Sequence, residues 1–159
     1  MPVFAINFFS IGIKDNILKN KKCVRVWIHN ILKNENVVYK NGELNFIFCD
    51  DKYLLNINKK FLRKNTLTDV IAFDYSEEGY FSADIFISYE RIKENANKYL
   101  EEPQTELIRV MAHGILHLAG YKDKTLESKK IMTKKEEEYI KMYLNYIKIC
   151  KSNKYGRST

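Results

Sequence analysis

The chain has 159 residues and a net charge of +7, with 45% hydrophobic and 30% charged residues. This length and composition are typical of one soluble globular domain, which we expect over residues 1–150, followed by a polar tail at 151–159. A membrane span is excluded, because no apolar run approaches the roughly 20 residues that a span needs. The N-terminus has no basic segment ahead of its apolar stretch, which argues against a signal peptide.

The positive charge favours an anionic partner such as nucleic acid. Lysines and arginines cluster at 19–22, at 59–64 and from residue 122 onward. A solvated surface in a lysine-rich protein explains the same charge equally well. The charge alone therefore does not identify a partner.

The cysteines are Cys23, Cys49 and Cys150, an odd number without metal-ligand spacing. Such cysteines are typical of reduced thiols in a cytoplasmic protein. We therefore expect no disulfide and a cytoplasmic location.

The first part of the chain predicts two strands around a helix. Residues 2–9 form an apolar run expected as a buried strand, and residues 24–32 show apolar side chains at helical spacing. Residues 43–48 alternate apolar and polar side chains, as a strand does. The Asn-Gly pair at 41–42 is typical of a turn ahead of this strand.

The middle of the chain predicts a short helix and a hairpin. Asp50 or Asp51 can cap the helix, which would turn Leu54, Ile57 and Phe61 inward. Two strands are expected at 69–75 and 81–88, joined by a four-residue loop.

The remainder predicts helices. Ser88 can cap one that runs to about residue 100, and Pro103 suits the first turn of the next. That next helix, residues 104–119, is apolar nearly all round, which places it in the middle of the fold. A last helix is expected from about 125 to 149. Together these elements predict an α+β fold, a single domain with a small mixed β-sheet of about four strands packed by helices.

His113 and His117 form the most informative pair, within His-Gly-Ile-Leu-His-Leu-Ala-Gly-Tyr-Lys-Asp. Residues at i and i+4 leave the same face of a helix, so both imidazoles can hold one metal ion. Gly120 suits the left-handed residue that ends a helix, and the turn after it returns Asp123 as a third ligand. Three protein ligands with an open position are the pattern of a catalytic zinc.

A structural role for the two histidines stays open, because this spacing arises often by chance. Gly114 stands where H-E-x-x-H metalloproteases carry their general base, which argues against a peptidase. A glycine inside a helix costs roughly 1 kcal/mol relative to alanine. A close approach by substrate, by the metal's water or by a strand would explain it, as would a tight helix crossing. His29, beside Trp27 and Ile28, is interpreted as a buried core histidine.

Residues 113–121 resemble the signature of the YbeY family of bacterial endoribonucleases, H-G-x-L-H-L-x-G-Y-D-H. Residues 67–73 are similar to its P-T-D-V-L-S-F segment, and residues 82–88 to its L-G-D-I-x-I-S segment. The resemblance implies a zincin-like active-site helix, one Zn²⁺ per chain and a single-strand-specific endoribonuclease. It also implies a role in ribosomal RNA processing and ribosome biogenesis, with 3′-end maturation of 16S rRNA and the small ribosomal subunit as partner.

The chain departs from the family pattern near the expected site. Asp123 stands at the family's third histidine, and because carboxylate oxygen is a legitimate zinc ligand, we expect a site of His113, His117 and Asp123. Leu62 stands at the family's arginine, and the resemblance offers the adjacent Arg63 as a phosphate contact. Two further departures are Leu67 and Ala83.

Several roles stay open around this site. Lys60 and Lys64 either contact flanking phosphates or form a solvated basic turn. Thr68 is expected to close a turn, whereas Asp69 either does the same or orients the site. No glutamate is placed to act as base. Two other functions remain, a non-catalytic ribosome-assembly factor with structural zinc and a zinc metallopeptidase.

Overall fold

A computed structural model describes residues 3–37 and 39–156. No helix among these residues is both long enough and apolar enough to cross a bilayer. The described residues form four strands and five helices, in the order β1 (Val3–Ser10), α1 (Lys21–Asn34), β2 (Asn41–Cys49), α2 (Asp51–Leu62), β3 (Val70–Asp74), β4 (Tyr80–Ser88), α3 (Tyr89–Lys98), α4 (Pro103–Leu118) and α5 (Leu126–Gly156).

The four strands form one mixed sheet in the order β1-β2-β4-β3. β1 and β2 are parallel, as are β2 and β4, whereas β3 pairs antiparallel with β4. Parallel neighbours need a crossover, and the segments that contain α1 and α2 provide the two crossovers. The expected α+β fold with a small mixed sheet is thereby confirmed.

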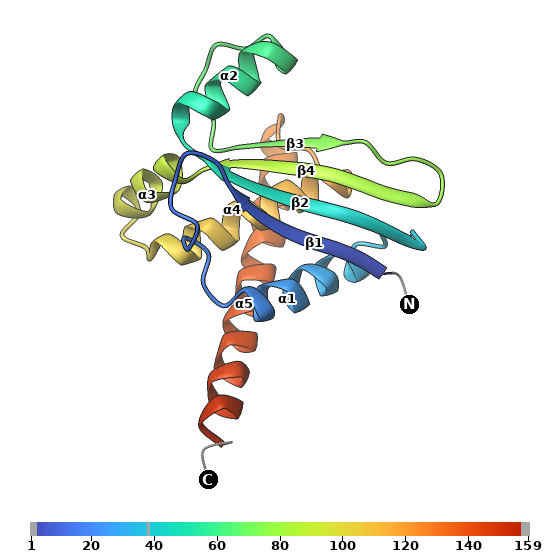
Figure 1. Ribbon diagram of the computed structural model, residues 1–159, viewed down its shortest axis with the longest axis vertical. Coiled ribbons are helices and arrows are strands. Elements are labelled where there is room, and N and C mark those ends of the chain that lie inside the picture. Colours follow the sequence, from blue (N-terminus) through green and yellow to red (C-terminus); the bar gives the residue numbers. More distant parts are fainter. Residues whose placement is uncertain (1–2, 38, 157–159) are drawn as a thin grey trace.

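Helices cover the two faces of the sheet unequally (Figure 1). α1, α4 and α5 pack on one face, where alternate residues of β2 such as Leu44 and Phe46 join the main core. α2 packs on the other face through Leu54, beside Ile71 of β3. α4 contacts β3, β4 and α5, and so lies in the middle of the molecule, as its apolar sequence predicts.

Gly114, inside α4, marks a close approach of the helix to the sheet. A Cβ atom at this position would lie 2.9 Å from Cγ2 and 3.1 Å from Cδ1 of Ile85 on β4. Optimal carbon–carbon contacts are about 3.5–4.0 Å, so a side chain here would displace Ile85. Of the explanations that the sequence left open, the approach of a strand is the one that the structure supports.

Two helices begin at capping residues expected from the sequence. The Asp50 carboxylate accepts a hydrogen bond from the backbone N–H of Tyr53 at 2.8 Å, and Ser88 Oγ accepts one from the backbone N–H of Arg91 at 3.4 Å. α4 begins with Pro103 in its first turn. Each cap satisfies a backbone donor that the first turn of a helix leaves free.

Three local expectations are wrong. The Asn-Gly pair at 41–42 belongs to β2, where the glycine is needed because a Cβ would lie 2.5 Å from the carbonyl oxygen of Phe81. Phe61 is 57% exposed at the end of α2. His29 is exposed, because it follows the buried Ile28 by about 100° around α1.

α5 is longer than expected, since it continues to Gly156 instead of ending near residue 149. Residues 126–155 contain no proline or glycine, the two residues that most disfavour a helix, so the sequence allows the helix to continue past residue 149.

On α5, Cys150 forms a disulfide with Cys23 of α1, which corrects the expectation of three reduced thiols. The pairing depends on the extra length of α5, which carries Cys150. Cys49 is free and buried, and burial raises the pKa of its thiol to about 12. The cysteines therefore give no support for a reducing compartment.

Candidate metal centre

The three ligands expected from the sequence converge beside the C-terminal half of α4. Nε2 of His113 and Nε2 of His117 lie 2.9 Å apart, and each lies 3.2 Å from Oδ2 of Asp123. Among the described residues, these three form a group whose ligand atoms all lie within 4.8 Å of one another. Zinc bonds of about 2.0–2.2 Å at tetrahedral angles separate ligand atoms by about 3.3–3.6 Å, so this triangle is close to the size that the ion needs.

The second ring nitrogen of each histidine faces a hydrogen-bond acceptor. Nδ1 of His113 lies 3.1 Å from Oε2 of Glu136 on α5, and Nδ1 of His117 lies 3.0 Å from the backbone carbonyl oxygen of Tyr121. Because a carbonyl and an ionised carboxylate only accept, each Nδ1 carries a hydrogen. In the neutral ring, Nε2 then presents its lone pair to the centre of the triangle.

Three electron-pair donors therefore face one another. Two imidazole lone pairs and a carboxylate oxygen at these distances repel each other unless a proton or a cation lies between them. A divalent cation satisfies all three, and a set of two nitrogens and one oxygen suits zinc. Burial lowers the pKa of His113, but the hydrogen bond and charge of Glu136 outweigh it and leave the pKa raised. Protons consequently compete with the metal for these nitrogens.

The turn after α4 places both Asp123 and the Tyr121 carbonyl. Gly120 has a φ of 104°, a value that favours glycine, and the N–H groups of residues 119–121 bond back to the carbonyls of 115–117. The Tyr121 phenol donates a hydrogen bond of 2.7 Å to Glu35, just beyond α1. The turn is therefore tied to a helix distant in sequence.

Glu35, at the end of α1, is hydrogen-bonded to the turn after α4 and to α5. Its side chain, only 6% exposed, accepts hydrogen bonds from the phenols of Tyr121 and Tyr139 and from Nζ of Lys135 at 3.3 Å. Burial raises the pKa of this carboxyl, but the three donors outweigh burial and leave the pKa lowered. Glu35 stays ionised and holds Tyr121, whose carbonyl orients His117.

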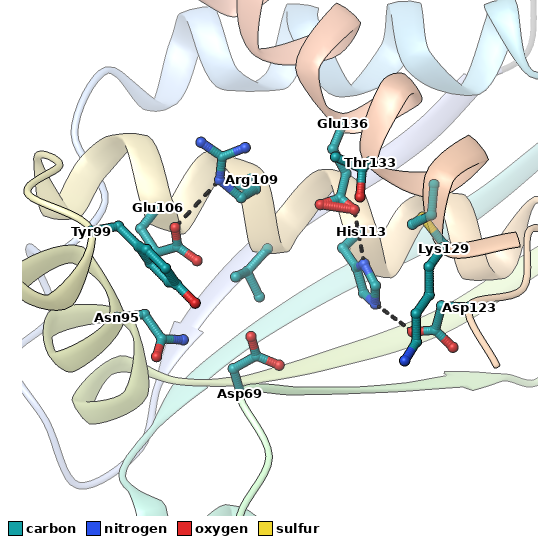
Figure 2. Close-up of a pocket in the computed structure, with 12 residues that line it drawn as sticks. Asp69, Asn95, Tyr99, Glu106, Arg109, His113, Asp123, Lys129, Thr133 and Glu136 are labelled. Carbon is teal, nitrogen blue, oxygen red and sulfur yellow. Dashed lines mark hydrogen bonds and ion pairs between the residues drawn. The ribbon is translucent and has the colours of Figure 1, made fainter. Parts of the chain in front are cut away.

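His113 and Asp123 lie at one end of a cleft of about 440 Å³ along α4 (Figure 2). At its other end, the buried Glu106 pairs with Arg109 at 3.4 Å. Asp69, just before β3, faces the same cleft across from α4 in Figure 2. Burial raises the pKa of the Asp69 carboxyl, an effect that the charge of His113 offsets only in part.

The other residues singled out in the sequence lie outside this group. Arg63 is an exposed, left-handed residue that ends α2, and it does not line the cleft along α4. Lys60 is exposed as well, whereas Lys64 lines a second cleft that reaches His117. The Thr68 hydroxyl donates to the carbonyl oxygen of Val70 at 3.3 Å, in the segment that leads into β3.

Glu136 and the Tyr121 carbonyl are contacts that sequence reasoning missed. Glu136 lies 23 positions after His113 and on another helix. The sequence pattern that could have indicated Glu136 is its helical spacing from apolar residues. It lies four residues after the buried Met132 and three before the buried Tyr139, on the inward face of α5. The carbonyl has no sequence signal, because every residue carries one.

Comparisons with known proteins give the chain its family. A family model described as Endoribonuclease YbeY matches residues 10–144. Endoribonuclease YbeY of Karelsulcia muelleri is 54% identical over 114 residues, which cover 72% of this chain and 79% of that protein. The Flavobacterium psychrophilum protein of the same name is 47% identical over 117 residues, covering 74% and 82%. That of Christiangramia forsetii is 44% identical over 138 residues, covering 87% and 94%.

A solved structure has a similar fold. The solution structure of a Thermotoga maritima protein matches with a TM-score of 0.61 at 25% identity, over 93% of this chain and 95% of that one. The three converging side chains all lie within the residues that the family model matches. This chain therefore belongs to the YbeY family of endoribonucleases.

Proposed function

We propose that the chain is a zinc-dependent endoribonuclease that cleaves single-stranded RNA at His113, His117 and Asp123. The observation that carries the proposal is the convergence of two imidazole nitrogens and one carboxylate oxygen in a chain of this family. The Nδ1 atoms of both histidines are hydrogen-bonded elsewhere, which leaves Nε2 for the metal. The proposed substrate is ribosomal RNA on the small ribosomal subunit in the cytoplasm, including the 3′ end of 16S rRNA.

One zinc ion per chain would supply a Lewis acid for a phosphoryl oxygen and lower the pKa of a coordinated water. The chain's own residues prepare the ligand atoms for it. Glu136 and the Tyr121 carbonyl hold the two imidazoles with Nε2 inward. Asp123, in place of a neutral histidine, adds one negative charge to the site.

The basic character of the chain supports a polyanionic substrate. The net charge is +7, and Arg63 and Lys64 stand side by side at the end of α2. We retain Arg63 as a proposed phosphate contact, which its exposure allows. Such contacts would make RNA binding weaken steeply as salt is added.

The geometry at position 114 disfavours a metallopeptidase of the H-E-x-x-H type. A side chain at this position would point at Ile85 of the sheet. A glutamate there would enter the core and not the metal centre. A non-catalytic assembly factor differs from an endoribonuclease in a measurable way, because it would hold zinc without cleaving RNA.

Metal content and cleavage together test the proposal. Wild type, His117→Ala and Asp123→Ala are purified without chelator, then assayed for zinc and for cleavage of a single-stranded RNA. We expect about one zinc per chain in wild type, with zinc and cleavage falling together in both variants. His29→Ala is the matched control, because His29 is exposed and remote in sequence from the site.

Wild type without zinc would contradict the metal centre. Full zinc without RNA cleavage would instead favour the assembly factor.

A second experiment identifies the nucleophile of the cleavage reaction. It uses an RNA substrate with a single 2′-deoxynucleotide at the cleavage position. Loss of cleavage at saturating RNA, where weaker binding has no effect, assigns it to the 2′-hydroxyl of RNA, and continued cleavage assigns it to water.

A further inference from the structure

A second cleft, of about 460 Å³, borders the metal centre between the end of α2 and β3. We call it the α2–β3 cleft. His117 lines it, whereas His113 and Asp123 line the first cleft along α4. The three metal ligands therefore line both clefts between them, and a strand bound across the metal centre would occupy both.

Asn58, which lines the α2–β3 cleft, carries a buried acceptor without a partner. The residue is 2% exposed, and its Nδ2 donates to the carbonyl oxygen of Thr66 at 2.9 Å. Because that carbonyl only accepts, the amide nitrogen must face it, which fixes the position of Oδ1. Within residues 4–37 and 39–152, Oδ1 of Asn58 is the one buried side-chain nitrogen or oxygen that lacks a hydrogen-bond partner. A buried acceptor left unpaired is unfavourable, and because Oδ1 has almost no exposed surface, a donor of a bound ligand reaches it only after the wall of the cleft moves aside.

The charge of the α2–β3 cleft suits a nucleotide better than that of the cleft along α4. Lys64 lines it, and no Asp or Glu does so among the described residues. Four carboxylates line the cleft along α4. A phosphodiester is therefore more readily held beside Lys64. Leu67, which is 55% exposed, adds apolar surface for a base.

We propose that the α2–β3 cleft holds the ribonucleotide next to the scissile phosphate, with a donor of that nucleotide on Asn58 Oδ1 and its phosphate near Lys64. This inference rests on the proposed RNA cleavage and adds the path of the strand, which reaches the metal centre past His117. The donor is either the ribose 2′-hydroxyl or an exocyclic amino group of the base. The 2′-hydroxyl would also distinguish RNA from DNA.

Photo-cross-linking locates the strand without depending on cleavage. Single-stranded RNA with 4-thiouridine at successive positions is irradiated with the zinc-loaded chain, and the cross-linked peptide is mapped by mass spectrometry. We expect cross-links within residues 62–72. Cross-links confined to other surfaces, such as the lysine-rich α5, would overturn the proposal.

Competition for this cross-link identifies the donor. Unlabelled oligonucleotides carry either one 2′-deoxynucleotide or one base without an exocyclic amino group. We expect one of the two series to compete about five- to tenfold less well at a single position, because one hydrogen bond to a buried acceptor is lost. The sensitive series assigns the donor to the ribose or to the base. Insensitivity at every position of both series would overturn the role of Oδ1.

Variants of Lys64 test whether its charge contributes to RNA binding. Asn58 is not substituted, because its Nδ2 also donates a hydrogen bond to Thr66 and its loss would disturb the fold. Lys64→Gln should raise KM for RNA cleavage about three- to fivefold with kcat unchanged, and should lower the salt slope of binding by about one. Lys59→Gln is the matched control, exposed on α2 and outside the cleft. Equal effects of the two variants would overturn the assignment of Lys64.

The two proposals fail in different ways. A chain that cross-links in the α2–β3 cleft but cleaves no RNA contradicts the proposed function and leaves the cleft assignment standing. Normal cleavage without a cross-link in this cleft contradicts the inference and leaves the function standing.

Discussion

Two polar groups lie along α4, and they differ in the source of their positive charge. The Arg109 guanidinium forms ion pairs with Glu101, Glu106 and Glu137, so these carboxylates have a cation within the chain. At the other end, His113 and His117 meet Asp123, and no lysine or arginine among the described residues forms an ion pair with that carboxylate. The Arg109 group contains its own counter-charge and can stabilise the fold. The group of His113, His117 and Asp123 contains no lysine or arginine and can bind a cation from solution.

The largest expected effect separates these groups by their response to zinc. At about 100 times its Kd, zinc should raise the free energy of unfolding of wild type by about 2.7 kcal/mol. The double variant His113→Ala, His117→Ala should show no such increase, and Arg109→Met should keep it. Thermal unfolding with zinc and with chelator measures the difference. A zinc-dependent gain in the double variant would erase the distinction between the groups.

A smaller effect on zinc binding is expected when the hydrogen bond between Glu136 and His113 is weakened. Glu136→Gln keeps the size of the side chain but removes the charge beside Nδ1 of His113. Zinc affinity should fall about 10–100-fold, as is usual when a ligand loses its hydrogen-bonded carboxylate. Titration against a coloured chelator measures it, with the exposed Glu138→Gln as control. Equal affinities would show that Glu136 only packs against the ring.

Arg109→Met should affect stability and leave zinc affinity unchanged. Three carboxylates would lose their cation, and because the side chain is 22% exposed, water offsets part of the loss. We expect the free energy of unfolding in urea to fall by about 1–2 kcal/mol. Lys134→Met, on the exposed surface of α5, is the control. A lower zinc affinity in Arg109→Met would mean that the two groups are coupled.

The remaining prediction is a pH dependence at Glu106. Burial, followed by its hydrogen bond with Glu101, raises the pKa of the Glu106 carboxyl from 4.5 to about 7. Because the folded state holds this proton more tightly, the contribution of Glu106 to stability is present below pH 4.5 and lost as the pH rises through 7. Glu106→Gln should therefore lose less stability than wild type between about pH 5 and pH 8, measured by urea unfolding. Identical pH profiles would contradict the raised pKa.

The parts of the site that the sequence predicts are those set by local geometry. Helical spacing places His113 above His117, and the glycine turn returns Asp123, so all three were predicted without tertiary information. Glu136 was not predicted, because its position depends on how α5 packs on α4. Asn58 was not singled out either, because only burial reveals that its acceptor lacks a partner.

In the fold, too, features set by neighbouring residues were predicted, whereas features set by contacts between distant segments were not. Capping by Asp50 and Ser88 and the burial of α4 follow from neighbouring residues, and these expectations are confirmed. Gly42 and Gly114 are different, because each serves a close approach between segments far apart in the sequence. An Asn-Gly pair in a strand looks like a turn until the partner strand is known. The Cys23–Cys150 disulfide depends in the same way on where α5 ends.

The short sequence span of the three ligands has a consequence for the order of folding. They lie within residues 113–123, so α4 and one turn suffice to bring them together. The sheet instead joins distant segments, such as Val3 of β1 with Asn41 of β2. Closing a short loop costs less chain entropy than closing a long one, so local contacts form early. An ion captured at this stage would stabilise α4 before β2 and β4 pair, and Glu136 would reach it only when α5 docks.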